Sequence, residues 1–270
     1  MGSGKTVVAA ACAYFAWQNG CQAALMAPTE LLAQQHQRTM ETLLAGTGLR
    51  VGLLVGSMTA AQKRDCRAAL AAGALDLIVG THALLSEGVS FRRLGLVITD
   101  EQHRFGVDQR AALAAKSGEK DRPHVLVMSA TPIPRTLALM IYGDLDLSVI
   151  DQLPPGRTPV ATYLIREDKR ARLYAFVRKQ VAQGRQVYIV CPAVDQEDPE
   201  GLKAAEQYGR QLQEEVFPDL RVGIVHGKQK ARDKQGVMAA FAAGEVDVLV
   251  STTVIEVGVD VPNASLMVVE

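Results

Sequence analysis

Apolar residues occur along the chain in short continuous runs that alternate with amphipathic stretches. The runs have the length of β-strands and are apolar throughout, which is typical of parallel strands covered on both faces. The amphipathic stretches have the apolar spacing and the capping residues of helices. In the first half we expect strands at Gln22–Ala27, Val51–Val55, Asp76–Val79, Leu96–Thr99 and Val125–Met128. The expected helices there are Thr6–Trp17, Leu31–Leu44 and one that Thr59 caps and that ends at Ala72.

The alternation restarts after Leu153–Pro159, where three prolines and a glycine cannot continue a helix or a strand. The strands expected beyond it are Ala161–Ile165, Val187–Cys191, Val222–His226, Val246–Val250 and Leu266–Val269. The expected helices are Lys169–Ala182, Leu202–Glu215 and Lys230–Ala242. This order predicts an α/β fold with mainly parallel sheets. We place a first domain at residues 1–152, a linker at 153–159 and a second domain at 160–270.

The second half repeats the first in sequence, without a gap over a helix, a turn and two strands. The matching pairs are Leu49–Gly56 with Leu220–Gly227, Ala68–Gly73 with Ala239–Gly244, and Asp76–Thr81 with Asp247–Thr252. Because α/β patterning alone does not require such a match, we infer two copies of one nucleotide-fold domain. Only the first copy carries Gly-Lys-Thr and Asp-Glu, so one nucleotide site is expected.

Composition limits the classes of function. The chain has 29 basic and 29 acidic residues, so its net charge does not attract nucleic acid. Any contact with nucleic acid must therefore come from local sites. The four cysteines form no Cys-x-x-Cys pair and are interpreted as reduced core thiols of a cytoplasmic protein. No apolar run approaches the roughly 20 residues that a membrane span needs, so no membrane association is expected.

The start of the chain, Gly2–Thr6, reads as the end of a phosphate-binding loop that runs into a helix. The backbone at Gly2, Ser3 and Gly4 is suited to closing on phosphate oxygens. Lys5 is placed to reach the β- and γ-phosphates, and the Thr6 hydroxyl to bind Mg²⁺. A flexible loop before a helix is the alternative for this segment taken by itself.

Two adjacent carboxylates follow the strand that ends at Thr99. Asp100 is placed to hold the shell of a Mg²⁺ ion, and Glu101 to orient or deprotonate a water. A solvated sheet edge is the alternative, but the phosphate loop and the carboxylates together favour an ATP and Mg²⁺ site. Gln102 and His103 come next in sequence. A hydrogen bond within the loop is the alternative for both.

Loops after strands in the two copies are the places where a nucleic-acid backbone is expected to bind, by hydroxyls and helix-start N–H groups. The residues proposed for these contacts are Pro28, Thr29, Thr81, His82, Thr252 and Thr253. For each threonine alone the alternative is a helix N-cap. His36, His124 and His226 are interpreted as packing or surface residues.

Together these motifs resemble the superfamily-two helicases and translocases, which have two RecA-like domains. The resemblance covers essentially the whole chain. The segments that carry it are Ala27–His36, Gly80–Ala83, Asp100–Val107, Ser129–Thr136, Leu153–Val160 and Thr252–Ala264. Arg104–Gly106 and Pro132–Thr136 are shared with the transcription-repair coupling translocases. The Leu153–Val160 linker and Val257–Ala264 are more similar to the RecG branch of DNA helicases.

The resemblance implies an ATP-dependent DNA helicase or translocase that acts on branched or duplex DNA in recombination and repair. The motifs do not give the oligomeric state, and a monomer is favoured. It implies that Asp100, Glu101 and His103 act with Lys5 in catalysis and that Gln102 contacts the nucleotide. It also implies that nucleotide state is coupled to DNA by four further residues. These are Ser129, Thr131, Gly258 and Asp260. The role of Arg135 stays open between a solvated helix face and a carboxylate partner.

Three parts of the family pattern are missing from this sequence: the wedge domain, the strand that feeds the phosphate loop and the segment that carries the arginine finger. We therefore expect the fold to be truncated at both ends and residues 1–270 alone to be nearly inactive. The alternatives are a transcription-repair coupling translocase and a nucleotide-binding piece without turnover. The motifs alone do not decide between DNA and RNA, although Asp100–His103 and the linker favour DNA.

Overall fold

The structure is a computed structural model in which the chain divides into two compact units, Met1–Thr158 and Pro159–Glu270. It describes residues 3–100, 112, 113, 115–117, 122–129, 146–152, 160–191, 206–226, 229–252 and 261–270. The predicted linker, residues 153–159, lies outside the described residues.

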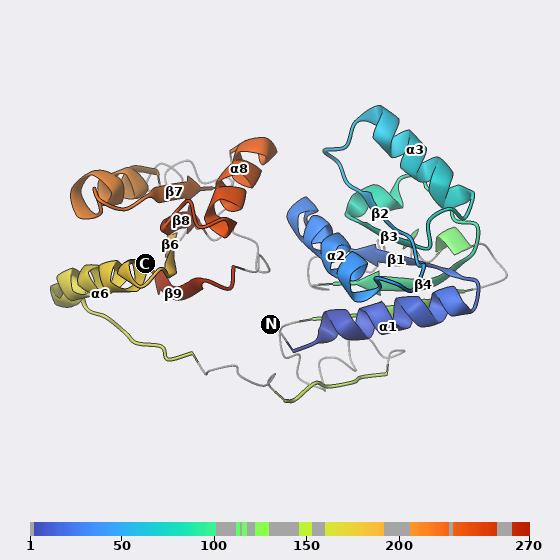
Figure 1. The fold of residues 1–270 in the computed structure, drawn as a ribbon, viewed down its shortest axis with the longest axis horizontal. Coiled ribbons are helices and arrows are strands. Elements are labelled where there is room, and N and C mark those ends of the chain that lie inside the picture. The colour runs from blue at the N-terminus through green and yellow to red at the C-terminus, as the bar shows by residue number, and fades with distance from the viewer. Residues whose placement is uncertain are drawn as a thin grey trace. The chain divides into compact units, whose positions relative to one another are not determined.

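The first unit is built on a parallel sheet of five strands in the order β2-β3-β1-β4-β5 (Figure 1). The strands are β1 (Gln22–Met26), β2 (Val51–Leu54), β3 (Leu77–Gly80), β4 (Leu94–Thr99) and β5 (His124–Val127). The helices are α1 (Lys5–Gln18), α2 (Glu30–Leu43) and α3 (Ala60–Ala71), with short 3-10 turns at His82–Leu85 and Ala115–Ser117. The parallel α/β class predicted from the sequence is therefore confirmed for this unit.

The central strands β1, β3 and β4 are covered on both faces, and side chains of β1 alternate between the two cores. Leu25 packs with Ala9 and Ala13 of α1 and with Met40 of α2. The other face has a core of its own, which includes Met26, Leu54, Leu70 of α3, Ile78 and Leu84. Ala9, Ala10 and Ala13 on α1 are at most 4% exposed, and their small side chains let the helix lie close to the sheet. Burial on both faces explains why the strands read as continuous apolar runs.

Two predicted helix caps are present. The Thr29 hydroxyl accepts a hydrogen bond from the Leu32 N–H at the start of α2. Thr59 and Gln62 form the expected capping box before α3, because each side chain bonds the backbone N–H of the other residue. These caps satisfy helix N–H groups that have no partner within the helix.

The second unit has a parallel four-stranded sheet in the order β7-β8-β6-β9. Its strands are β6 (Gln186–Cys191), β7 (Val222–Val225), β8 (Val248–Thr252) and β9 (Ala264–Val269). Its helical elements are α6 (Arg170–Ala182), α8 (Ala231–Ala242), the 3-10 turn Glu167–Lys169, the helical residues 206–211 and the π-helical turn Leu212–Val216. Val177, Val187, Ile189, Phe217 and Val250 form much of the core.

One strand predicted for this unit was wrong. Residues 161–165 are assigned to no strand, and Tyr163 and Leu164 are 79% and 98% exposed. The apolar run has the composition of a strand, but a strand also needs a hydrogen-bonded neighbour. Within the described residues the sheet β7-β8-β6-β9 does not include this segment.

The predicted internal repeat is confirmed by topology, because β2-β3-β1-β4 and β7-β8-β6-β9 are the same arrangement. Side chains repeat as well. The buried Gln22 amide donates to the carbonyls of Leu70 and Leu75, and Gln186 donates to the equivalent carbonyls of Phe241 and Val246. The pairing register also shifts at the same place in both sheets, next to each of these glutamines.

An arginine–aspartate clasp is repeated in the same way. Arg50 bonds both carboxylate oxygens of Asp76 and the Gly73 carbonyl, and its backbone N–H also donates to Asp76. Arg221 makes the same four bonds to Asp247 and to the Gly244 carbonyl. Gly73 and Gly244 have φ angles of 74° and 77°, a left-handed conformation that glycine adopts readily. Each clasp ties the residue before one strand to the residue before its neighbour.

The clasps lower the pKa of both carboxyl groups. Burial alone would raise the pKa of Asp76, but the side-chain and backbone hydrogen bonds from Arg50 outweigh it. For Asp247 the hydrogen bonds from the Arg221 side chain are the largest cause, and burial opposes them. A carboxyl group with a lowered pKa in the folded state adds stability above its unfolded pKa, and that stability is lost as the pH falls through the folded pKa.

We expect Asp76→Asn and Asp247→Asn each to lower the free energy of unfolding by about 1–2 kcal/mol at pH 7, as for lost hydrogen bonds to a charged group. The deficit should shrink below about pH 4, because the wild-type carboxylates then become protonated. Urea unfolding at pH 7 and pH 3 measures this. Asp65→Asn is the control, since Asp65 is 70% exposed and pairs only with the neighbouring Arg64. A deficit that is the same at both pH values would contradict the assignment.

Candidate nucleotide and nucleic-acid sites

The start of α1 lies at the carboxyl edge of the first sheet. A tight turn at Asn19 and Gly20 connects α1 to β1, so α1 runs antiparallel to β1. The first residue of α1 therefore lies near the carboxyl end of β1. Gly4 precedes the helix with a φ angle of 92°, and no side chain caps the first turn. Lys5 and Thr6 are the first two helical residues, both partly exposed, and Ser3 precedes them. Gly2 lies outside the described residues.

Asp100 lies at the same edge, directly after β4. Its backbone N–H donates to the Met26 carbonyl at 3.0 Å, which continues the ladder between β4 and β1 by one residue. The residue is only 9% exposed. Its Oδ2 lies 2.7 Å from Nε2 of His36 on α2. Among the residues that the structure describes, no hydrogen bond to Oδ1 is present.

The second unit has a carboxylate at the equivalent position. Leu96 and Leu266 hold the same register against β1 and β6, which makes Glu270 the counterpart of Asp100. The Glu270 N–H donates to the Val190 carbonyl at 3.0 Å, as the Asp100 N–H does to Met26. Here both carboxylate oxygens are used. Oε1 and Oε2 accept from Arg170 at 2.9 and 3.0 Å, and Oε1 also accepts from the Tyr208 hydroxyl at 2.6 Å.

The environment of Glu270 therefore differs from that of Asp100. The guanidinium of Arg170, with its pKa raised by hydrogen bonds to Glu167 and Glu270, offsets the charge of Glu270. Burial and the nearby Glu270 charge raise the pKa of the Cys191 thiol to about 11, so this thiol stays protonated at neutral pH. Burial raises the pKa of Tyr208 as well, followed by its hydrogen bond to Glu270. Both oxygens of Glu270 thus have donors among the described residues, unlike those of Asp100.

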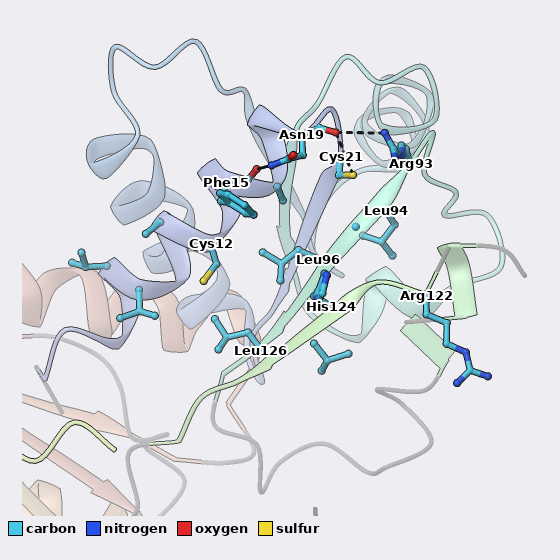
Figure 2. Close-up of a pocket in the computed structure, with 16 residues that line it drawn as sticks. Cys12, Phe15, Asn19, Cys21, Arg93, Leu94, Leu96, Arg122, His124 and Leu126 are labelled. Atoms are coloured by element: carbon cyan, nitrogen blue, oxygen red, sulfur yellow. Dashed lines mark hydrogen bonds between the residues drawn. The ribbon is translucent and has the colours of Figure 1, made fainter. Parts of the chain in front are cut away.

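A separate groove of about 1080 Å³ lies between α1 and the strands β4 and β5 (Figure 2). Figure 2 shows Cys12 and Phe15 on the α1 side and Leu96 and Leu126 on the strand side. The lining is mainly apolar, and Asn19 and Arg93 lie at the end where α1 turns into β1. An apolar lining is unsuited to triphosphate, so the groove is not the candidate nucleotide site.

The loops proposed for nucleic acid differ in exposure. His82 is exposed, and Pro28 and Thr29 are partly exposed at the start of α2. Thr81 and Thr252 are 1% and 0% exposed, and neither hydroxyl has a hydrogen-bond partner within the part of the chain that the structure describes. In this arrangement a phosphate cannot reach the hydroxyl of Thr81 or Thr252. The Thr29 hydroxyl serves as the N-cap of α2, the alternative stated for each threonine.

Several predicted site residues lie outside the described residues. In the first unit these are Glu101, Gln102, His103, Thr131 and Arg135. In the second unit they are Thr253, Gly258 and Asp260. Ser129 is described and lies partly exposed two residues after β5. The described part of the chain contains no group of three or more potential metal-ligating side chains and no helix long and apolar enough to cross a membrane.

His36, interpreted from the sequence as a packing or surface residue, is nearly buried, and its imidazole also bonds the carboxylate of Asp100. The sequence contains a signal for this. His36 lies four residues after Leu32 and four before Met40, so it occupies the buried stripe of α2. A polar residue in a buried stripe needs a hydrogen-bond partner, and that need points to a carboxylate nearby.

Comparison with known proteins agrees with this geometry. A family model described as DEAD/DEAH box helicase matches residues 1–140, and one described as helicase conserved C-terminal domain matches residues 168–270. The chain belongs to the DEAD/DEAH box helicase family. Its two parallel-sheet units have the RecA-like helicase fold that the sequence predicted.

Within this helicase family the chain is similar to RecG proteins. It is 52% identical over 270 residues to the ATP-dependent DNA helicase RecG of Synechocystis sp., and 50% identical over 272 residues to that of Escherichia coli K12. Each alignment covers 100% of this chain but only 32% and 39% of the relative. The chain thus spans about a third of the length of these curated relatives.

Solved structures give the same result. The structure of RecG bound to a three-way DNA junction matches with a TM-score of 0.79 and 44% identity, over 98% of this chain and 34% of that one. The helicase MrfA bound to DNA matches with a TM-score of 0.65 but only 17% identity, over 94% of this chain and 39% of the other, and so shows the fold alone. The resemblance to the RecG branch of helicases stated from the sequence is confirmed.

The buried hydroxyls of this helicase chain can be tested by stability. We expect Thr81→Val and Thr252→Val to leave the melting temperature unchanged or higher, because each removes a buried hydroxyl that has no partner in the described structure. Thr29→Val is the control and should cost about 1 kcal/mol, since it removes a helix cap. A clear loss of stability in Thr81→Val or Thr252→Val would mean that the hydroxyl is hydrogen-bonded in the folded protein.

Proposed function

We propose that this chain is the ATP-driven core of a DNA helicase of the RecG type, which moves along branched or duplex DNA. The observation that carries the proposal is the difference between two equivalent sheet edges. Asp100 keeps one carboxylate oxygen without a donor among the described residues, whereas both oxygens of Glu270 are bonded to Arg170. The first edge also has the uncapped start of α1 with Lys5 and Thr6, so it suits a nucleotide and the second edge does not.

The chemistry of this edge fits MgATP. Uncapped backbone N–H groups and the positive end of the helix dipole favour a phosphate at the start of α1. A lysine at the first helical position opposes the same dipole unless an anion is bound, so Lys5 is suited to phosphate. Thr6 and Asp100 supply the hard oxygen ligands that Mg²⁺ prefers. When bound, Mg²⁺ would neutralise phosphate charge.

The remaining roles in this proposal rest on sequence position. Glu101, next to Asp100, orients and deprotonates the water that attacks the terminal phosphate. Gln102 and His103 follow it in the nucleotide site. Ser129, Thr131, Gly258 and Asp260 couple the nucleotide to the DNA. These assignments follow from matching positions in the helicase motifs.

The proposed DNA contacts lie on the loops that follow the strands, and they bind the backbone without reading the bases. Pro28, Thr29 and His82 are the accessible positions among the described residues of the first unit. Thr81, Thr252 and Thr253 complete the proposed set. Because Thr81 and Thr252 are buried, their hydroxyls contact phosphate only if these loops open when DNA binds. The solved structure of RecG bound to a three-way DNA junction supports branched DNA as the substrate class.

Two variants test the nucleotide site in the full-length protein. Lys5→Ala should weaken ATP binding and abolish turnover, because it removes the cation that meets the phosphates. Glu101→Gln should bind ATP normally but lose at least about 100-fold in turnover, since an amide cannot take a proton from water. Nucleotide affinity and branched-DNA-stimulated ATP hydrolysis are the measurements. Near-normal turnover in Glu101→Gln would remove that residue from the catalytic role.

A second test concerns the DNA contacts. His82→Ala should weaken binding to branched DNA by about 1 kcal/mol, the value of a typical hydrogen bond, and equally for all base sequences. The control is His124→Ala, which changes an exposed histidine on β5 that is not in the proposed DNA set. Fluorescence anisotropy on junctions of different sequence measures both. A change of base preference in His82→Ala would contradict backbone binding.

A further inference from the structure

His36 and Asp100 form a close and nearly buried pair. Nε2 of His36 lies 2.7 Å from Oδ2 of Asp100, and the two side chains are 11% and 12% exposed. When Asp100 is ionised, as a magnesium ligand must be, its oxygens can only accept, so Nε2 of His36 is the donor. The contact joins residues that are 64 positions apart in sequence, on different elements of the first unit.

The helix that carries His36 is fixed at its start. The Thr29 hydroxyl accepts from Leu32 N–H, and Oε1 of Glu30 accepts from the Ser57 N–H at 2.9 Å in the loop after β2. Leu32 and Met40, one turn on either side of His36, are buried against the sheet. The imidazole is therefore presented to Asp100 from a rigid support.

The hydrogen bond between His36 and Asp100 fixes the rotation of the Asp100 carboxylate, which the backbone does not determine. The hydrogen bond from Asp100 N–H to Met26 sets the main chain at the sheet edge, but it does not set the rotation of the carboxylate. The bond from His36 occupies Oδ2 and thereby holds that rotation. In the second unit Arg170 donates to both oxygens of Glu270. It therefore orients that carboxylate and also occupies both of its oxygens.

We propose that His36 is a positioning residue that orients the Asp100 carboxylate, so that Oδ1 remains the oxygen for Mg²⁺ or one of its water ligands. The inference rests on the proposed function, because it requires Asp100 to serve a magnesium–nucleotide site. Hydrogen-bonding partners of metal ligands commonly change metal affinity by about 10- to 100-fold when they are removed. His36 is expected to act in this way, without touching the nucleotide itself.

Three substitutions of His36 separate positioning from packing. His36→Leu fills the site but removes the donor. His36→Gln places an amide N–H at about the reach of the imidazole Nε2, and His36→Asn is polar but too short. Gln37→Leu is the matched control, because Gln37 is the next residue on α2 and, among the described residues, its side chain bonds the exposed Glu41 and not Asp100. Asp100→Asn tests the magnesium site itself.

The readout is binding rather than turnover. The affinity of a fluorescent ADP is measured on the full-length protein with Mg²⁺ and with EDTA, and Mn²⁺ affinity of the ADP complex is measured by electron paramagnetic resonance. We expect His36→Leu and His36→Asn to weaken Mn²⁺ binding by about 10-fold or more, with ADP affinity in EDTA unchanged. His36→Gln should recover most of the loss, and Gln37→Leu should match the wild type.

Each outcome is decisive. Normal Mn²⁺ affinity in His36→Leu, or equal loss of ADP affinity with and without Mg²⁺, overturns the inference. So does a His36→Gln variant that folds but is no better than His36→Asn. If His36→Leu does not fold, the comparison of His36→Gln with His36→Asn decides alone. If Asp100→Asn leaves Mn²⁺ affinity unchanged, the proposed magnesium site fails, whereas a loss there with normal His36 variants refutes only the positioning role.

Discussion

The parallel hydrogen-bond ladder between β1 and β4 is the constraint on which the rest of the candidate site depends. Parallel strands end at a common edge, and residues that follow them are brought together there from distant parts of the sequence. The bond from Asp100 N–H to Met26 extends this ladder one residue past β4 and holds a carboxylate at that edge. The turn from α1 into β1 brings Lys5 and Thr6 to the same edge. Neither arrangement depends on a long loop.

The two units show how one scaffold acquires two roles. Strand order, the buried glutamines Gln22 and Gln186, and the arginine–aspartate clasps are the same in both, so the shared features are those that hold the sheet together. The difference that bears on the candidate site lies at the carboxyl edge. Among the described residues the Asp100 carboxylate is bonded by one imidazole, whereas the Glu270 carboxylate accepts from Arg170 and Tyr208. A change of partner around one carboxylate is thus enough to separate a candidate cation site from a structural ion pair.

Much of the fold could be predicted from the sequence, because buried parallel strands are continuous apolar runs and helix starts are marked by capping residues. The capping box of Thr59 and Gln62 and the apolar strand β3, which follows Asp76, are examples. The segment 161–165 failed because its apolar composition does not specify a hydrogen-bonded neighbour. For the site, motif position identified Asp100, but it did not reveal His36, whose partner is set by tertiary packing. The burial of Thr81 and Thr252 was missed for a similar reason, since a residue after a strand can face either the solvent or the core.

The central claim is that nucleotide binds at one sheet edge and not at its structural copy. Amide hydrogen exchange of the full-length protein, with and without saturating Mg²⁺ and ADP and in the absence of DNA, tests this most directly. We expect slower exchange at the start of α1, residues 4–8, and at residues 99–100, with no change at residues 250–252 of the second sheet. Equal protection at both edges, or protection only in the second unit, would contradict it.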